Sequence, residues 1–100
     1  MKGYWVARSK INDAAQYKKY TDRVPAIMAK YNGRILARGG RFKVLEGPQK
    51  FERYIVIEFP SLEQAVACHD SPEYQEAAAF RKSGAGEVEL VIVEGLSPPA

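Results

Sequence analysis

Cysteine and histidine are nearly absent from this chain. Cys68 is the single cysteine and His69 the single histidine, so an intrachain disulfide is excluded and no cysteine-based metal framework is expected. No apolar run approaches the roughly 20 residues that a membrane-spanning helix needs. The first residues enter strand-like sequence directly, without the pattern of a signal peptide. We therefore expect no metal, no cofactor, no membrane partner and a cytoplasmic location.

An excess of charge of one sign is also lacking. Fifteen lysines and arginines stand against 12 acids, for a net charge of +3, and the two signs are interleaved. Nucleic-acid binding is typical of a clustered basic stripe, so no nucleic-acid partner is expected. A chain of 100 residues, 46% of them hydrophobic, suits one small domain. We place that domain at residues 1–96 and expect a flexible tail at 97–100.

The hydrophobic periodicity predicts six main elements in order. We expect strands over residues 3–9, 34–39, 53–59 and 87–94, and helical regions over 12–32 and 61–82. Pro25 interrupts the first helical stripe and predicts a restart near Val24. Ser71 and Pro72 predict a new helix start within the second region. This order is typical of a ferredoxin-like α+β sandwich, in which helices cover one face of a four-stranded antiparallel sheet.

A bend is predicted where Gly39 and Gly40 follow Arg38 in the second strand. Glycine inside a strand is costly and usually marks a bulge, a bend or a close backbone approach. We expect the strand to bend there and to resume through Phe42 and Val44. A cation beside such a bend is either a ligand-binding group or half of an ion pair.

The third and fourth strands are apolar on both faces. Tyr54 and Val56 alternate with the isoleucines of the third strand, and Val91 and Val93 alternate with the apolar residues of the fourth. A sheet with one solvated face should alternate cleanly between apolar and polar residues. Because the helices can cover only one face, a second copy of the chain is the simplest cover for the other. We expect a homodimer formed through the sheet faces.

Several short segments, taken together, resemble a known family. They are Ala37-Arg38-Gly39-Gly40, Leu45-Glu46-Gly47, Ile57-Glu58-Phe59-Pro60-Ser61, Ser71-Pro72-Glu73-Tyr74-Gln75, Arg81 and Val93-Glu94-Gly95. In this order and spacing the chain resembles the domain of unknown function 1330 family over nearly all of residues 3–95. The resemblance implies dimerisation of the ferredoxin-like units into an α/β barrel.

That superfamily contains small monooxygenases, muconolactone isomerases, haem-dependent peroxidase-like enzymes and stress-response proteins, and a shared fold does not fix the activity. Many family members look aromatic where Cys68 and His69 stand in this chain. If that pair lines the pocket, the ligand preference should differ from that of the relatives. Cys68 itself is predicted to be a small buried residue rather than a nucleophile.

Two charged residues are candidates for a ligand site. Strand alternation places Arg38 on the face opposite Ile35, where its guanidinium could grip a carboxylate in a bidentate fork, or pair with Glu58 or Glu46. Glu58 is in phase with Tyr54 and should face the barrel interior. There it is either a base of raised pKa or a carboxylate paired with Arg38 or Arg8.

The other candidates carry both functional and structural interpretations. His69 is a proton shuttle, a metal or haem ligand, or a favourable charge at a helix C-terminus. Tyr74 and Arg81 lie seven residues apart on one helix face, where they contact a ligand or serve as a core aromatic and a surface ion pair. Gly39 and Tyr4 complete the candidate ligand site, although Tyr4 also fits a core or interface position.

Two functional hypotheses follow. In the first, the homodimer binds a small organic anion in a pocket between sheet and helices, and Arg38 holds the anionic group. A cofactor-independent isomerase or monooxygenase reaction of the bound acid is possible in this case. In the second, the dimer is a non-catalytic stress-response or regulatory ligand-binding protein.

Overall fold

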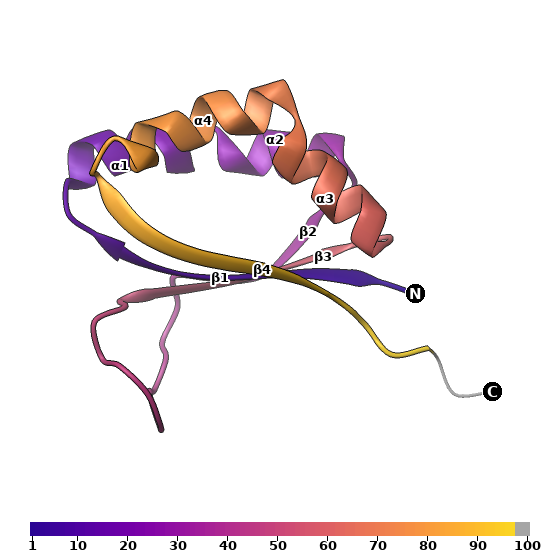
Figure 1. Ribbon diagram of the computed structural model, residues 1–100, viewed down its shortest axis with the longest axis horizontal. Coiled ribbons are helices and arrows are strands. Elements are labelled where there is room, and N and C mark those ends of the chain that lie inside the picture. Colours follow the sequence, from indigo (N-terminus) through magenta and orange to yellow (C-terminus); the bar gives the residue numbers. More distant parts are fainter. Residues whose placement is uncertain (98–100) are drawn as a thin grey trace.

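A four-stranded antiparallel sheet carries four short helices on one of its faces (Figure 1). The computed structural model describes residues 1–97, so the expected tail lies outside the described residues apart from Ser97. The elements are β1 (Gly3–Ile11), α1 (Ala14–Thr21), α2 (Val24–Lys30), β2 (Arg34–Arg38), β3 (Arg53–Phe59), α3 (Leu62–Asp70), α4 (Pro72–Lys82) and β4 (Gly86–Glu94). The strand order is β2-β3-β1-β4, which confirms the ferredoxin-like sandwich.

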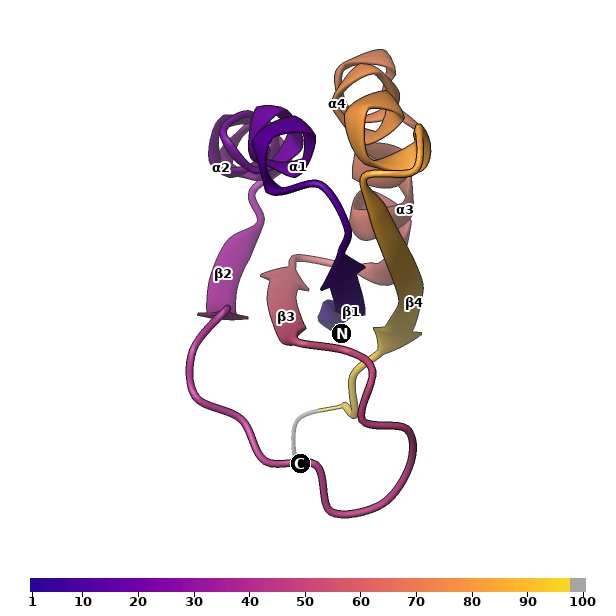
Figure 2. The same ribbon diagram turned by 90° about the vertical axis from the view of Figure 1, so that its left-hand side faces the viewer.

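Alternation along β1 divides the sheet into a covered and an uncovered face. Trp5, Ala7 and Ser9 are buried beneath the helices, while Val6 points to the opposite side. The helices form two pairs above the covered face: α1 and α2 lie over β2 and β3, and α3 and α4 lie on the side of β4 (Figure 2).

Helix boundaries follow local capping chemistry. The carboxylate of Asp13 accepts a hydrogen bond from the backbone N–H of Gln16 and so begins α1. The predicted restart is confirmed: α2 begins at Val24, and Pro25 occupies a first-turn position where no intrahelical N–H is needed. Asn32, with a φ of 62°, ends α2 in a left-handed conformation that Asn tolerates.

Two serines start the second pair of helices. Ser61 Oγ accepts from the backbone N–H of Gln64, and the Gln64 side chain donates to the carbonyl of Tyr31. Ser71 Oγ accepts from the N–H of Tyr74 and donates to the carbonyl of Cys68 at 2.7 Å. One serine therefore joins the end of α3 to the start of α4.

The connection between β2 and β3 corrects one expectation. Residues 39–52 form no strand, so the resumption predicted through Phe42 and Val44 is wrong. The segment hangs away from the helices on the uncovered side of the sheet (Figures 1 and 2). The Phe42 ring lies 4.9 Å from that of Tyr54, which anchors the start of the loop without strand pairing.

The uncovered sheet face is apolar, as the strand pattern predicts. Val6, Val91 and Val93 are exposed there, at 38%, 59% and 51% of their full areas, and Leu36 of β2 is exposed at 48%. No helix in residues 1–97 packs against this face (Figure 1). Exposed apolar surface of this kind typically marks an interaction site.

A substitution at Gly3 tests how closely β1 packs against the turn into α3. A β-carbon at Gly3 would lie 2.5 Å from the Ser61 carbonyl oxygen, which is backbone and cannot move aside cheaply. We expect Gly3→Ala to lower the free energy of unfolding by about 1–3 kcal/mol, measured by urea denaturation. Gly40→Ala is the matched control, because nothing lies within 4 Å of its added carbon. Equal stability of the two variants would contradict this packing.

Candidate functional site

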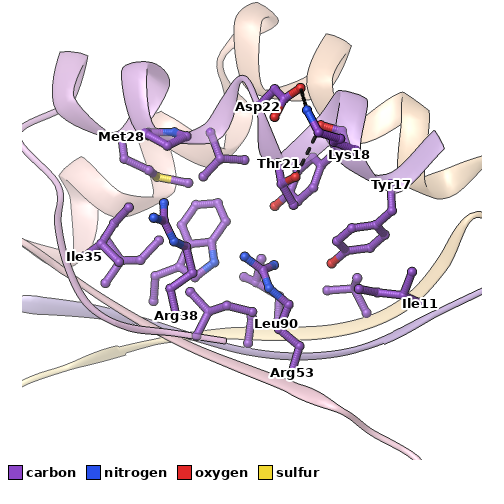
Figure 3. Close-up of a pocket in the computed structure, with 18 of the residues that line it drawn as sticks. Ile11, Tyr17, Lys18, Thr21, Asp22, Met28, Ile35, Arg38, Arg53 and Leu90 are labelled. Atoms are coloured by element: carbon purple, nitrogen blue, oxygen red, sulfur yellow. Dashed lines mark hydrogen bonds and ion pairs between the residues drawn. The ribbon is translucent and has the colours of Figure 1, made fainter. Parts of the chain in front are cut away.

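A cavity of about 530 Å³ lies between the sheet and helices α1 and α2 (Figure 3). Strand side chains form its floor and helix side chains its roof, so that two layers of the sandwich contribute to one site. Its main apolar lining residues are Trp5, Tyr17, Met28, Ile35, Ile57 and Leu90. Mostly apolar walls with a few polar groups are characteristic of small-molecule sites.

Two arginines point into this cavity from the sheet. Arg38 extends from β2 toward Met28, and Arg53 extends from β3 toward Tyr17 (Figure 3). Within residues 1–97 neither guanidinium forms an ion pair or side-chain hydrogen bond. Asp22 is the one acid in the described lining, and Lys18 binds it at 2.8 Å. The cavity therefore presents two uncompensated positive charges.

A bulge in β2 explains the direction of Arg38 and corrects the predicted one. The register between β2 and β3 shifts between Ile35 and Ala37. Ile35 pairs with Ile57. Arg38 pairs with Ile55, which lies two residues before Ile57 in β3 and therefore on the same face. Because residues paired across strands share a face, Arg38 and Ile35 lie on the same, helix-covered side rather than on opposite sides.

Gly39 contributes to the site through its backbone. Its φ is 63°, which confirms the predicted bend, and its N–H donates to the carbonyl of Tyr54 at 3.3 Å. A β-carbon at Gly39 would lie 3.5 Å from Nε of Arg53. The glycine thus lies beside the second arginine of the cavity.

Tyr74 and Arg81 lie behind the cavity, in the core between α1 and α4. Nη2 of Arg81 donates to Tyr74 Oη at 3.0 Å, and Tyr74 Oη lies 2.9 Å from Tyr20 Oη. Tyr20 also lines the cavity. Burial and the neighbouring Tyr74 hydroxyl raise the pKa of Tyr20, so its hydroxyl stays protonated. The seven-residue spacing does bring Tyr74 and Arg81 together, as expected.

Glu58 and Tyr4 lie on the uncovered face, away from this cavity. The Tyr4 hydroxyl donates to Oε2 of Glu58 at 3.2 Å. Desolvation and the Glu58 carboxylate raise the pKa of Tyr4. Arg8, one expected partner of Glu58, instead donates from Nε to Glu89 at 2.8 Å. Glu58 thus faces the side that the sequence predicts, and its partner is a tyrosine.

Cys68 and His69 do not line the cavity. Nδ1 of His69 lies 2.9 Å from Asp70 Oδ1 in the last turn of α3, and its ring contacts those of Trp5 and Tyr74. Cys68 is fully buried, and burial raises the pKa of its thiol to about 11. This pair therefore gives no basis for a pocket that differs from those of the relatives.

Arg53 is the cavity residue that the sequence reasoning missed. Strand alternation could have indicated it, because Arg53 stands two residues before Ile55 and so shares the covered face of β3. Nothing in the local sequence marks Tyr20 as a polar site residue, since its hydroxyl partner comes from a helix far away in sequence.

The described residues offer no ready-made metal site. No group of three His, Cys, Asp or Glu side chains lies close enough together within residues 1–97 to hold a metal ion. In the same range, every helix is too short or too polar to cross a bilayer.

The fold places the protein among small ferredoxin-like α+β proteins, and its cavity lies between the sheet and the helices. The chain belongs to the family described as domain of unknown function (DUF1330), whose sequence profile matches residues 2–96. No curated protein matched the sequence.

Solved structures share the fold at low sequence identity. A protein of unknown function from Rhodopseudomonas palustris, RPA0582, has a TM-score of 0.75 at 20% identity, covering 97% of this chain and 84% of that one. SnoaB, a cofactor-independent oxygenase from Streptomyces nogalater, has a TM-score of 0.64 at 15% identity, with coverages of 97% and 95%. A dimeric ferredoxin-like protein of unknown function from Bacteroides fragilis has a TM-score of 0.63 at 16% identity, with coverages of 94% and 96%.

The burial of Cys68 predicts an unreactive thiol. We expect Ellman's reagent at neutral pH to modify the native protein at least about a hundredfold more slowly than the urea-unfolded protein. Val66→Cys in a Cys68→Ala background is the matched control, because Val66 is an exposed residue of the same helix. Rapid modification of native Cys68 would contradict its placement in the core.

Proposed function

We propose that this protein is a homodimer that binds a small organic anion in the cavity beneath α1 and α2. The observation that supports this is the pair of arginines, Arg38 and Arg53, which point into an apolar cavity without a carboxylate partner in residues 1–97. The anionic group lies between the two guanidinium groups, and the apolar body of the ligand lies against Trp5 and Leu90.

Arginine suits this role because its planar guanidinium donates two parallel hydrogen bonds to a carboxylate. A charged hydrogen bond of this kind contributes about 1.5–3 kcal/mol. Arg38 is exposed and Arg53 is half-buried, so the apolar walls remove the bound group from water only in part and strengthen the attraction moderately. A monocarboxylate shared by both arginines, or a dicarboxylate spanning them, satisfies this arrangement.

The uncovered sheet face supports the homodimer. It is apolar, and the ferredoxin-like relative from Bacteroides fragilis is dimeric. Face-to-face packing of two such sheets buries the exposed valines of β1 and β4 and gives the α/β barrel that the resemblance implies. Tyr4 and Glu58 then lie in the dimer interface rather than in the ligand cavity.

Turnover of the bound acid, by a cofactor-independent monooxygenase or isomerase, is a second proposal. The likeness to SnoaB favours it at the level of the fold. Its base would not come from Glu58 or His69 of the same chain, because neither lines the cavity. The only lining acid in the described chain, Asp22, is paired with Lys18. We therefore place non-catalytic binding first, as in a regulatory or stress-response protein.

Binding of meta-nitrobenzoate tests the arginine pair. We expect the wild-type protein to bind this carboxylate in calorimetric titrations and to bind the neutral meta-nitrobenzamide far more weakly. Arg38→Met and Arg53→Met should each weaken carboxylate binding roughly ten- to a hundredfold, since each removes a charged hydrogen bond.

Arg34→Met is the matched control for charge. Arg34 belongs to β2 like Arg38, but pairs across the strands with Glu58 and so lies on the uncovered face. It should leave the affinity unchanged. Equal weakening by all three variants would show that only the net charge matters, and equal binding of the acid and the amide would contradict an anion site.

The dimer is tested by a charge on the uncovered face. Val91→Asp should raise the dimer dissociation constant at least about tenfold, because a carboxylate would be buried there without a partner. The measurement is sedimentation equilibrium, with circular dichroism to confirm folding. Val66→Asp, at an exposed valine of α3, should leave the dimer intact. A Val91→Asp protein that remains fully dimeric would contradict packing through this face.

A further inference from the structure

A polar cluster behind the cavity has more hydrogen-bond donors than acceptors. Arg81 is only 6% exposed, its Nε has no partner, and no carboxylate lies within ion-pair distance of it in the described chain. Nη2 of Arg81 donates to Tyr74 Oη at 3.0 Å, and Tyr74 Oη in turn lies 2.9 Å from Tyr20 Oη. A buried arginine without an acid is unusual, because a charge removed from water normally needs a counter-charge.

The direction of these bonds follows from the chemistry of the donors. Arginine can only donate, so Tyr74 Oη accepts from Arg81. Either tyrosine hydroxyl could donate across the 2.9 Å contact between them. Because Tyr74 is completely buried and Tyr20 Oη is the acceptor beside its hydroxyl among the described residues, we assign the hydrogen of Tyr74 to Tyr20 Oη. Accepting from a cation also makes the Tyr74 hydroxyl a stronger donor. The hydrogen of Tyr20 is then the one left without an acceptor in residues 1–97.

Tyr20 is the one member of the cluster that lines the cavity. We propose that Tyr20 donates a hydrogen bond to an oxygen of the bound ligand, with Tyr74 and Arg81 as positioning residues that orient and polarise its hydroxyl. This inference rests on the proposed function, and it narrows the ligand to organic acids that carry a second oxygen acceptor. A hydroxyaryl acid as its phenolate, or an oxo acid through its carbonyl or enolate, has this chemistry.

A purely structural role for the cluster makes a different prediction. The Arg81 guanidinium lies 5.1 Å from the centre of the Tyr20 ring and 6.0 Å from that of Tyr74, so cation–π attraction holds the three side chains together. If that were their whole contribution, conservative changes would alter the stability of the protein without altering the ionisation of a bound ligand.

The test uses para-hydroxy-meta-nitrobenzoate, whose phenol changes colour on ionisation near neutral pH. A hydrogen bond from Tyr20 favours the phenolate, so the pKa of the bound phenol should lie below that of the free compound. We expect Tyr20→Phe to raise the pKa of the bound phenol by about one unit, measured by absorbance titration of the saturated complex. Tyr74→Phe should produce a smaller rise, because Tyr20 keeps its hydroxyl but loses its polarising neighbour.

Tyr17→Phe is the matched control. Tyr17 also lines the cavity and its ring contacts Tyr20 at 5.5 Å, but it takes no part in the cluster with Arg81. Tyr20→Phe should weaken binding of meta-nitrobenzoate, which lacks the hydroxyl, far less than binding of the hydroxylated acid as its phenolate. A phenol pKa that is insensitive to Tyr20→Phe, or that responds to Tyr17→Phe instead, would overturn this inference while leaving the arginine site intact. Failure of both nitrobenzoates to bind the wild-type protein would overturn the inference and the proposed function together.

Discussion

The cavity depends on the large side chains that α1 and α2 place above the sheet. Tyr17 and Tyr20 of α1 and Met28 of α2 are buried in the core, and all three line the cavity. Helix α4 buries Tyr74 and Arg81 on its own face, and neither of these lines the cavity. The place of the cavity beneath α1 and α2 is therefore set by which core side chains meet there.

The charged side chains in its lining distinguish this cavity from an ordinary packing defect. Arg8 and Lys30 lie on the surface and end in ion pairs with Glu89 and Glu73. Arg38 is exposed and Arg53 is half-buried, and both point toward apolar walls of the cavity without an ion-pair partner in residues 1–97. An anion bound there would supply the counter-charge that neither arginine has among the described residues. The same reasoning applies deeper in the core, where Arg81 is also without an acid among the described residues.

Patterns among residues that are close in sequence were sufficient to predict the fold but not the ligand site. Strand alternation, the Asp13 cap and the restart before Pro25 depend on neighbours in sequence, and all three are present in the structure. The direction of Arg38 was predicted wrongly, because the irregularity in β2 lies between Ile35 and Ala37, ahead of the glycines that drew attention. The contact of Tyr20 with the second helix pair depends on how α1 packs against α4, which no spacing within the chain encodes. The helices and strands therefore follow from residues that are close in sequence, whereas the cavity depends on contacts between residues that are far apart in the chain.

A crystal structure of the protein with meta-bromobenzoate would test the central claim most directly, since the anomalous signal of bromine locates the ligand without ambiguity. The account predicts the carboxylate between Arg38 and Arg53, with the bromine among the apolar side chains beneath α1 and α2. Bromine density against the uncovered sheet face, with the cavity empty, would contradict it.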